Sequence, residues 1–103
     1  MQSMDRVTLL MSLHRALWGE VPPRLRSVSC EANHESRTIH IRFIFDGTPD
    51  ETEMECVRAV GSEVEGDFLD DWRVHEETQV VPWPERMSHL SEMAFLRHEK
   101  ASD

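Results

Sequence analysis

Two neighbouring stretches of alternating apolar and polar residues constrain the fold of this chain most strongly. Every second side chain is apolar from residue 28 to 32 of the stretch 25–32, and again from residue 39 to 45 of the stretch 38–45, which is the period of a strand with one buried face. Residues 33–36, between them, have the composition of a turn. The two stretches therefore predict an antiparallel hairpin. Its inward face consists of Val28, Cys30 and Ala32 on the first strand and of Ile39, Ile41, Phe43 and Phe45 on the second.

A first helix is predicted before the hairpin, over residues 4–18. Ser3 is placed to cap its start, and Gly19 is placed to end it. Apolar residues recur along it at spacings of three and four, as in a helix that packs on a core. They are Met4, Val7, Leu10, Met11, Leu13, Leu17 and Trp18.

A second helix is predicted after the hairpin. Thr48-Pro49-Asp50-Glu51 matches a capping box with proline at the first helical position. At 100° per residue, the apolar face consists of Val57, Val60, Gly61, Val64 and Phe68, and the opposite face of Glu51, Glu55, Ser62 and Glu63. A glycine on the apolar face of a helix interior costs about 1 kcal/mol relative to alanine, so Gly61 indicates a close approach to a strand or to the first helix.

Residues 72–81 predict a third strand, in which Glu76 interrupts the apolar face and indicates an edge or a bulge. Pro82-Trp83-Pro84 and a loop over residues 85–91 precede a last short strand near residues 93–97, and the tail is expected to fray from about residue 98. We therefore expect residues 1–103 to form one α+β domain of two layers. An antiparallel sheet of about four strands would carry both helices on one face, in the order α-β-β-α-β-β.

Acidic residues are concentrated in the middle of the chain. The net charge is -9, and the stretch from Asp46 to Glu77 contains twelve acidic residues and two basic ones. Such a field repels nucleic acid and anionic membranes and attracts a basic partner. It also keeps a small protein soluble, which is the simpler interpretation. The side chains that would bind a partner protein are Glu51, Glu55, Glu63, Asp70, Asp71, Glu76, Glu77 and Trp83, although Trp83 is also suited to pack on its own core.

Neither an enzyme site nor a metal or cofactor site is predicted. The six histidines are scattered, and His75-Glu76-Glu77, the nearest approach to a metal motif, would split between two faces of a strand. Cys30 points inward on the hairpin and His40 outward, so two free, buried thiols are expected rather than a nucleophile with its base. The four glycines are isolated and form no phosphate loop.

Three segments resemble a family of small cytoplasmic immunity proteins from bacterial polymorphic toxin systems, including contact-dependent growth inhibition. The likeness lies in residues 13–31, 38–68 and 93–99. Its motifs are Gly19-Glu20-Val21-Pro22-Pro23, Phe43-Ile44-Phe45-Asp46-Gly47 and Phe95-Leu96-Arg97. The N-terminal apolar run is too short for a signal peptide or a membrane span, which agrees with a cytoplasmic location.

The resemblance implies a protein that binds one cognate toxin domain and blocks it without chemistry. Many toxins of such systems are nucleases, which must be basic to hold a phosphate backbone, so an acidic inhibitor would suit them. The motifs are structural, and the resemblance assigns no binding residues. The alternative is a small acidic adaptor or regulatory module with a partner unrelated to toxins.

Overall fold

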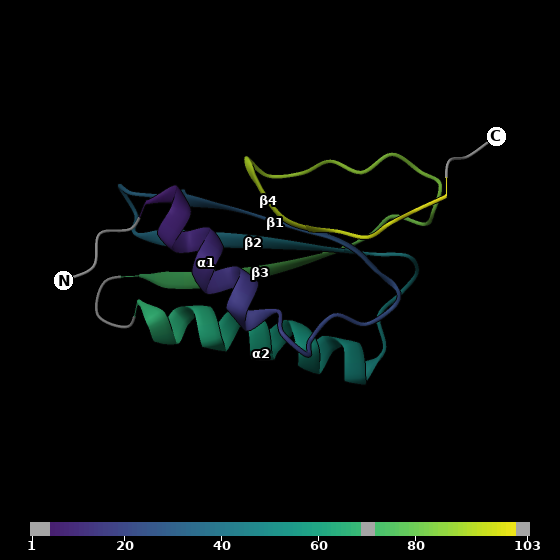
Figure 1. Cartoon of the computed structure of the whole chain (residues 1–103), viewed down its shortest axis with the longest axis horizontal. Helices are drawn as coiled ribbons and strands as arrows, with labels where there is room; N and C mark the ends of the chain where they lie inside the picture. Colours follow the sequence, from purple (N-terminus) through teal and green to yellow (C-terminus); the bar gives the residue numbers. More distant parts are fainter. Residues whose placement is uncertain (1–4, 69–71, 101–103) are drawn as a thin grey trace.

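The computed structural model describes residues 5–68 and 72–100 of the chain (Figure 1). The helices and strands follow in the predicted order α-β-β-α-β-β. They are α1 (Arg6–Ala16), β1 (Leu25–Asn33), β2 (Thr38–Phe45), α2 (Glu51–Asp67), β3 (Arg73–Val80) and β4 (Glu92–Leu96).

The hairpin of β1 and β2 is confirmed and forms the centre of the sheet. The two strands pair antiparallel, with Val28 opposite Phe43 and Cys30 opposite Ile41. The strand order is β3-β2-β1-β4, so β3 and β4 lie at the two edges. The inward side chains of these two central strands belong to the core and are almost completely buried, except Ala32 near the turn, which is partly buried.

The prediction of a purely antiparallel sheet is wrong, because β3 pairs parallel with β2. The cause is the connection between them. At 1.5 Å per residue, a helix as long as α2 runs back along the whole sheet, so the chain begins β3 at the same end as β2. The pairing of β4 with β1 is antiparallel, and the sheet is therefore mixed.

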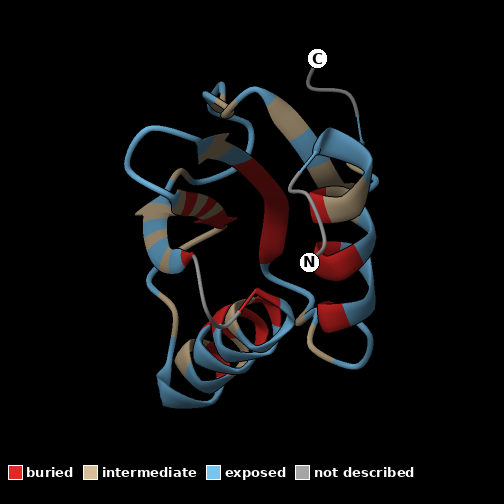
Figure 2. Ribbon diagram, turned by 90° about the vertical axis from the view of Figure 1, so that its left-hand side faces the viewer, coloured by how far each residue is buried: buried red, intermediate tan, exposed pale blue. Residues whose placement is uncertain are grey.

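Both helices lie on one face of the sheet, as predicted. Leu9 and Leu13 of α1 and Val60 of α2 belong to one core cluster with the inward residues of β1 and β2. Figure 2 shows the same division, with buried residues on the inner sides of the helices and exposed residues on their outer sides. The helices thus form a continuous outer layer over the sheet.

The opposite face is covered by the segment between β3 and β4. There, Ile44 is fully buried although it does not belong to the helix-side core. The backbone N–H of Leu90 donates to the Ser29 hydroxyl at 3.0 Å, and Arg42 donates to the Ser88 carbonyl at 3.0 Å. Residues 81–91 therefore form a second cover for the sheet, although of these we predicted residues 85–91 only as a loop and residue 81 as the end of the third strand.

Both helices begin at an aspartate, later than predicted. The N-cap of α1 is Asp5, which accepts from the Thr8 N–H at 2.7 Å, whereas Ser3 lies outside the described residues. The capping box of α2 is formed by Asp50 and Glu53 instead of Thr48 and Glu51. Two overlapping boxes exist in this sequence, and in the one that forms, Glu53 also bonds to Arg24 just before β1, which ties the helix to the sheet.

The close approach predicted at Gly61 is confirmed. A Cβ atom at this position would clash with the carboxylate of Glu76. Glu76 lies on β3, and its predicted position at an edge of the sheet is also confirmed. The glycine thus leaves room for a carboxylate between α2 and the edge strand.

Candidate functional site

The exposed face of α2 carries two carboxylates without a partner in the described part of the chain. Glu55 and Glu63 are both exposed, and neither forms an ion pair or a hydrogen bond with another described residue. Glu51 is also exposed but pairs with Arg58 on the same helix. Of the three α2 glutamates in the predicted binding surface, Glu55 and Glu63 therefore keep their full charge toward solvent.

The other acidic side chains of α2 have structural contacts. Asp67 accepts from the Ser12 hydroxyl at 2.6 Å and from Arg15 at 2.8 Å, and so joins α2 to α1. The Ser12 hydrogen bond, followed by that from Arg15, holds the pKa of Asp67 below its usual range. Glu53 is buried and bonded to Arg24, which lowers the pKa of Glu53. These carboxylates attach the helix and leave little charge for a partner.

The two glutamates of β3 point to opposite faces of the sheet. Glu76 is exposed on the helix side, beside Gly61 of α2. Glu77 lies under the 81–91 cover, where its partners are His40, Arg42 and Gln79. Burial alone raises the pKa of Glu77, but its hydrogen bonds outweigh that effect and hold the pKa below its usual range. Glu77 is therefore a structural carboxylate and not part of a surface shared with α2.

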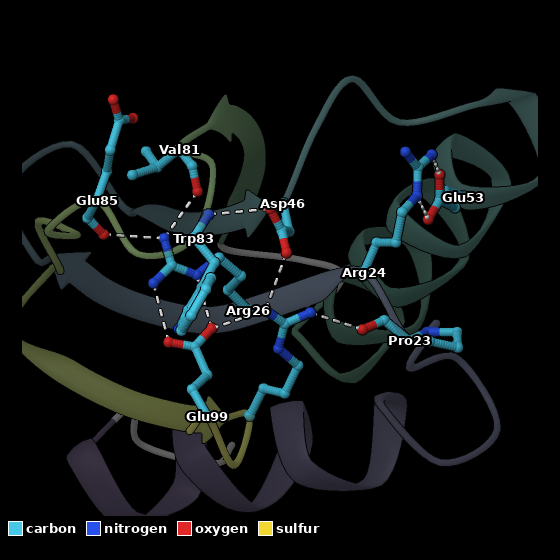
Figure 3. Close-up of polar contacts among 10 residues, drawn as sticks. Pro23, Arg24, Arg26, Asp46, Glu53, Val81, Trp83, Glu85 and Glu99 are labelled. Atoms are coloured by element: carbon cyan, nitrogen blue, oxygen red, sulfur yellow. Dashed lines mark hydrogen bonds and ion pairs between the residues drawn. The ribbon is translucent and has the colours of Figure 1, made fainter. Parts of the chain in front are cut away.

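Trp83, Asp70 and Asp71 complete the predicted set. Asp70 and Asp71 lie outside the described residues. Trp83 is 40% exposed, and its backbone N–H donates to Asp46 Oδ1 at 2.9 Å (Figure 3). Trp83 belongs to the cover on the other face of the sheet. The predicted set thus divides into the α2 glutamates with Glu76 on the helix side, and Glu77 with Trp83 on the other.

One exposed feature was not predicted as functional. α1 ends at Ala16, two residues earlier than predicted, and Trp18 lies in the turn just after the C-cap residue Leu17. Val7 and Met11 on the helix and Trp18 in this turn are exposed, with fractions of 62%, 64% and 77%. We expected them to face the core with the other apolar residues, but the buried side of α1 consists of Leu9, Ser12, Leu13, Ala16 and Leu17. At 100° per residue Val7 and Met11 lie opposite that side, and Trp18 follows at the C-terminal end of the helix; we call these three residues the α1 stripe. The sequence signal that could have indicated this surface is the presence of apolar residues on two opposite sides of the predicted helix.

A second polar cluster holds the C-terminal segment and the 81–91 cover. Arg26, whose side chain is 3% exposed, donates two hydrogen bonds to Glu99 at 2.7 and 2.9 Å and one each to the carbonyls of Val81 and Glu85 (Figure 3). Arg97 also donates to Glu99, at 2.9 Å. The chain was expected to fray from about residue 98, yet Glu99 is held by both arginines. This cluster fixes the fold and lies apart from α2.

The thiols are free and have the character of unreactive groups. Burial raises the pKa of Cys30 to about 12, and the thiol is fully enclosed. Cys56 is half-buried, and burial followed by a hydrogen bond with Glu20 raises the pKa of Cys56 as well. A nucleophilic cysteine needs a lowered pKa, so neither environment is that of a catalytic thiol.

We expect the protein to lose stability in acid. Carboxylates that the fold holds ionised have pKa values below their ordinary 3.8 or 4.5; they are Asp46, Glu53, Asp67, Glu77 and Glu99. Their contribution is complete above the ordinary values and is lost as the pH falls through the lowered ones. Thermal melts should give a nearly constant Tm between about pH 7 and 5 and a falling Tm below about pH 4. A Tm that rises between pH 4 and 3 would show that relief of the net negative charge dominates instead.

The fold and its surface define a class of protein. The chain is a small acidic α+β domain that carries, on its helix side, exposed apolar side chains and carboxylates unpaired within the described residues, and such surfaces are typical of proteins that bind other proteins. In residues 5–68 and 72–100, no group of three metal-binding side chains is assembled, and no helix is long and apolar enough to cross a membrane.

Comparison with known families makes this assignment specific. The family model of the MafI2 immunity protein matches residues 6–99, and the chain belongs to this family. A search of curated proteins gives no match. Membership supports an immunity function against a toxin, with a cognate toxin protein as the binding partner. Immunity proteins of this kind are not typically enzymes.

Proposed function

We propose that this protein neutralises a basic toxin domain of the nuclease type by binding it one to one and covering its active site. The family supplies the immunity function, and the charge distribution favours a basic partner. A nuclease must present positive charge to the phosphate backbone, and an acidic protein can occupy that surface. As a protector against an enzyme that degrades nucleic acid inside the cell, the protein would act in the cytoplasm.

The observation that carries this proposal is that, among the described residues, most arginines are paired within the fold, whereas several exposed carboxylates are not. Seven arginines form ion pairs with described carboxylates, so most of the positive charge is cancelled locally: Arg6, Arg15, Arg24, Arg26, Arg42, Arg58 and Arg97. Glu55 and Glu63 on α2, and Glu76 beside them on β3, have no such partner among the described residues. Three carboxylates without a described ion-pair partner therefore lie on the helix side, where they can attract a basic protein and speed its association.

Co-expression with the toxin domain encoded beside this gene tests the proposal. We expect the immunity protein to restore growth of cells that produce the toxin domain, and the two proteins to elute from a sizing column as a one-to-one complex. The matched control is a toxin domain from an unrelated system, which should remain toxic and unbound. Absence of both rescue and complex would overturn the proposed function, and a complex with an acidic toxin domain would overturn its electrostatic basis.

A further inference from the structure

The α1 stripe is an apolar surface that the fold of the monomer leaves uncovered. Val7, Met11 and Trp18 point away from the core side of α1, and Trp18 is the most exposed of the large apolar side chains in the described residues. The indole contributes nothing to the core in this position. Exposed tryptophan is unusual on a small soluble protein, whereas tryptophan is among the side chains most enriched at the energetic centre of protein interfaces.

The stripe comes close to α2 at Met11. The two helices pack against each other on the same face of the sheet. Between them lies a shallow hollow of about 150 Å³, which Met11 of the stripe and Asp67 of α2 both line. A partner that rests on the outer helix layer would therefore meet the apolar line of α1 and the free carboxylates of α2 together.

Charge decides between two possible occupants of the stripe. A second copy of this chain would bring another -9 net charge against the first, and the free carboxylates of α2 would lie close to that contact. Like charges brought together in an interface oppose association. A basic protein has the opposite sign and pairs with the same carboxylates while it covers the apolar line.

We propose that the α1 stripe is the anchor of the complex with the basic toxin domain, with Trp18 as its energetic centre. This inference rests on the proposed function and adds to it a division of tasks between the helices. The α2 carboxylates attract the partner, and the α1 stripe holds it. The matching toxin surface is an apolar pocket for the indole, rimmed by lysine or arginine side chains, which can also stack on the ring as cations.

Kinetic measurements on the purified immunity protein and toxin domain test this division. We expect Trp18→Ala to raise Kd by about thirtyfold and Met11→Ala by about tenfold, through faster dissociation, while the association rate changes by less than about twofold. Leu96→Ala is the matched control, because Leu96 is also an apolar side chain, 61% exposed, but lies on β4. Its Kd should stay within about twofold of the original.

The outcomes separate the two proposals. If the original protein binds the toxin domain and Trp18→Ala binds equally well, the anchor is overturned while the proposed function stands. If the original protein does not bind the toxin domain, both fall. A dimer of the original protein that Trp18→Ala converts to a monomer would assign the stripe to a second copy and also overturn the anchor. Thermal melts of Trp18→Ala should superimpose on those of the original protein, because the exposed indole is not part of the core.

Discussion

Replacement of Arg26 by alanine is expected to lower the free energy of unfolding by about 3–5 kcal/mol. The guanidinium is almost fully enclosed and bonds to the carboxylate of Glu99 and to the carbonyls of Val81 and Glu85. Its removal leaves two carbonyls without their donor, opens a void beside β1, and leaves Glu99 to Arg97 alone. The 81–91 cover and the C-terminal segment are both attached through this side chain, so both should loosen.

Urea denaturation of the original protein and of Arg26→Ala gives the measurement. Arg58→Ala is the matched control, because it removes the same side chain from the exposed Arg58–Glu51 pair on α2. Exposed pairs contribute about 0–1 kcal/mol, so its midpoint should hardly move. Equal effects of the two substitutions would show that Arg26 is no more important to the fold than a surface arginine.

The sequence was sufficient for the elements whose side chains alternate or repeat with one clear period. The hairpin is correct in extent and pairing. The apolar side chains of β2, such as Ile41 and Phe43, and those of β1 can share one core only if the two strands place them on the same face of the sheet. The pairing of β3 could not be read in the same way. Its own pattern is weak and interrupted by Glu76, and the information lies in the length of α2, which brings the chain back for a parallel strand.

The exposure of the predicted binding residues could be read from the sequence where helix geometry alone decides it, and their role in binding stays a prediction. Glu55 and Glu63 face outward because they lie opposite the line of buried valines on α2. Glu77 was assigned to the same surface by composition, but one position along a strand reverses the face, and its partners Arg42 and His40 come from a different part of the chain. Long-range ion pairs of this kind leave no pattern in the local sequence.

The exposure of Trp18 was missed although the local pattern of the sequence was clear. Its spacing fitted a core helix, and nothing in a single sequence says which of two apolar sides meets the sheet. Only the packing of Leu9 and Leu13 on the core shows that Trp18 faces solvent. An apolar residue that the structure leaves exposed at the end of an amphipathic helix is therefore informative once the buried side of that helix is known.

Charge reversal at the two free carboxylates of α2 is expected to slow association with the toxin domain. In Glu55→Lys/Glu63→Lys, kon at low salt should fall by about tenfold or more, because steering by opposite charge is lost. The dependence of kon on ionic strength should become weaker, since screening then has less attraction to remove. Dissociation should change less than in Trp18→Ala, because the two glutamates lie beside the apolar anchor rather than within it.

The control variant must change the net charge by the same amount at a site away from α2. Glu31→Lys/Glu35→Lys does so on the β1–β2 hairpin, where both side chains are exposed. If the α2 surface faces the toxin, the hairpin variant should retain most of the original kon, since charges more than a Debye length of about 8–10 Å from the partner are largely screened. Equal slowing in both variants would assign the steering to net charge alone. An unchanged kon in the α2 variant at low salt would remove α2 from the interface.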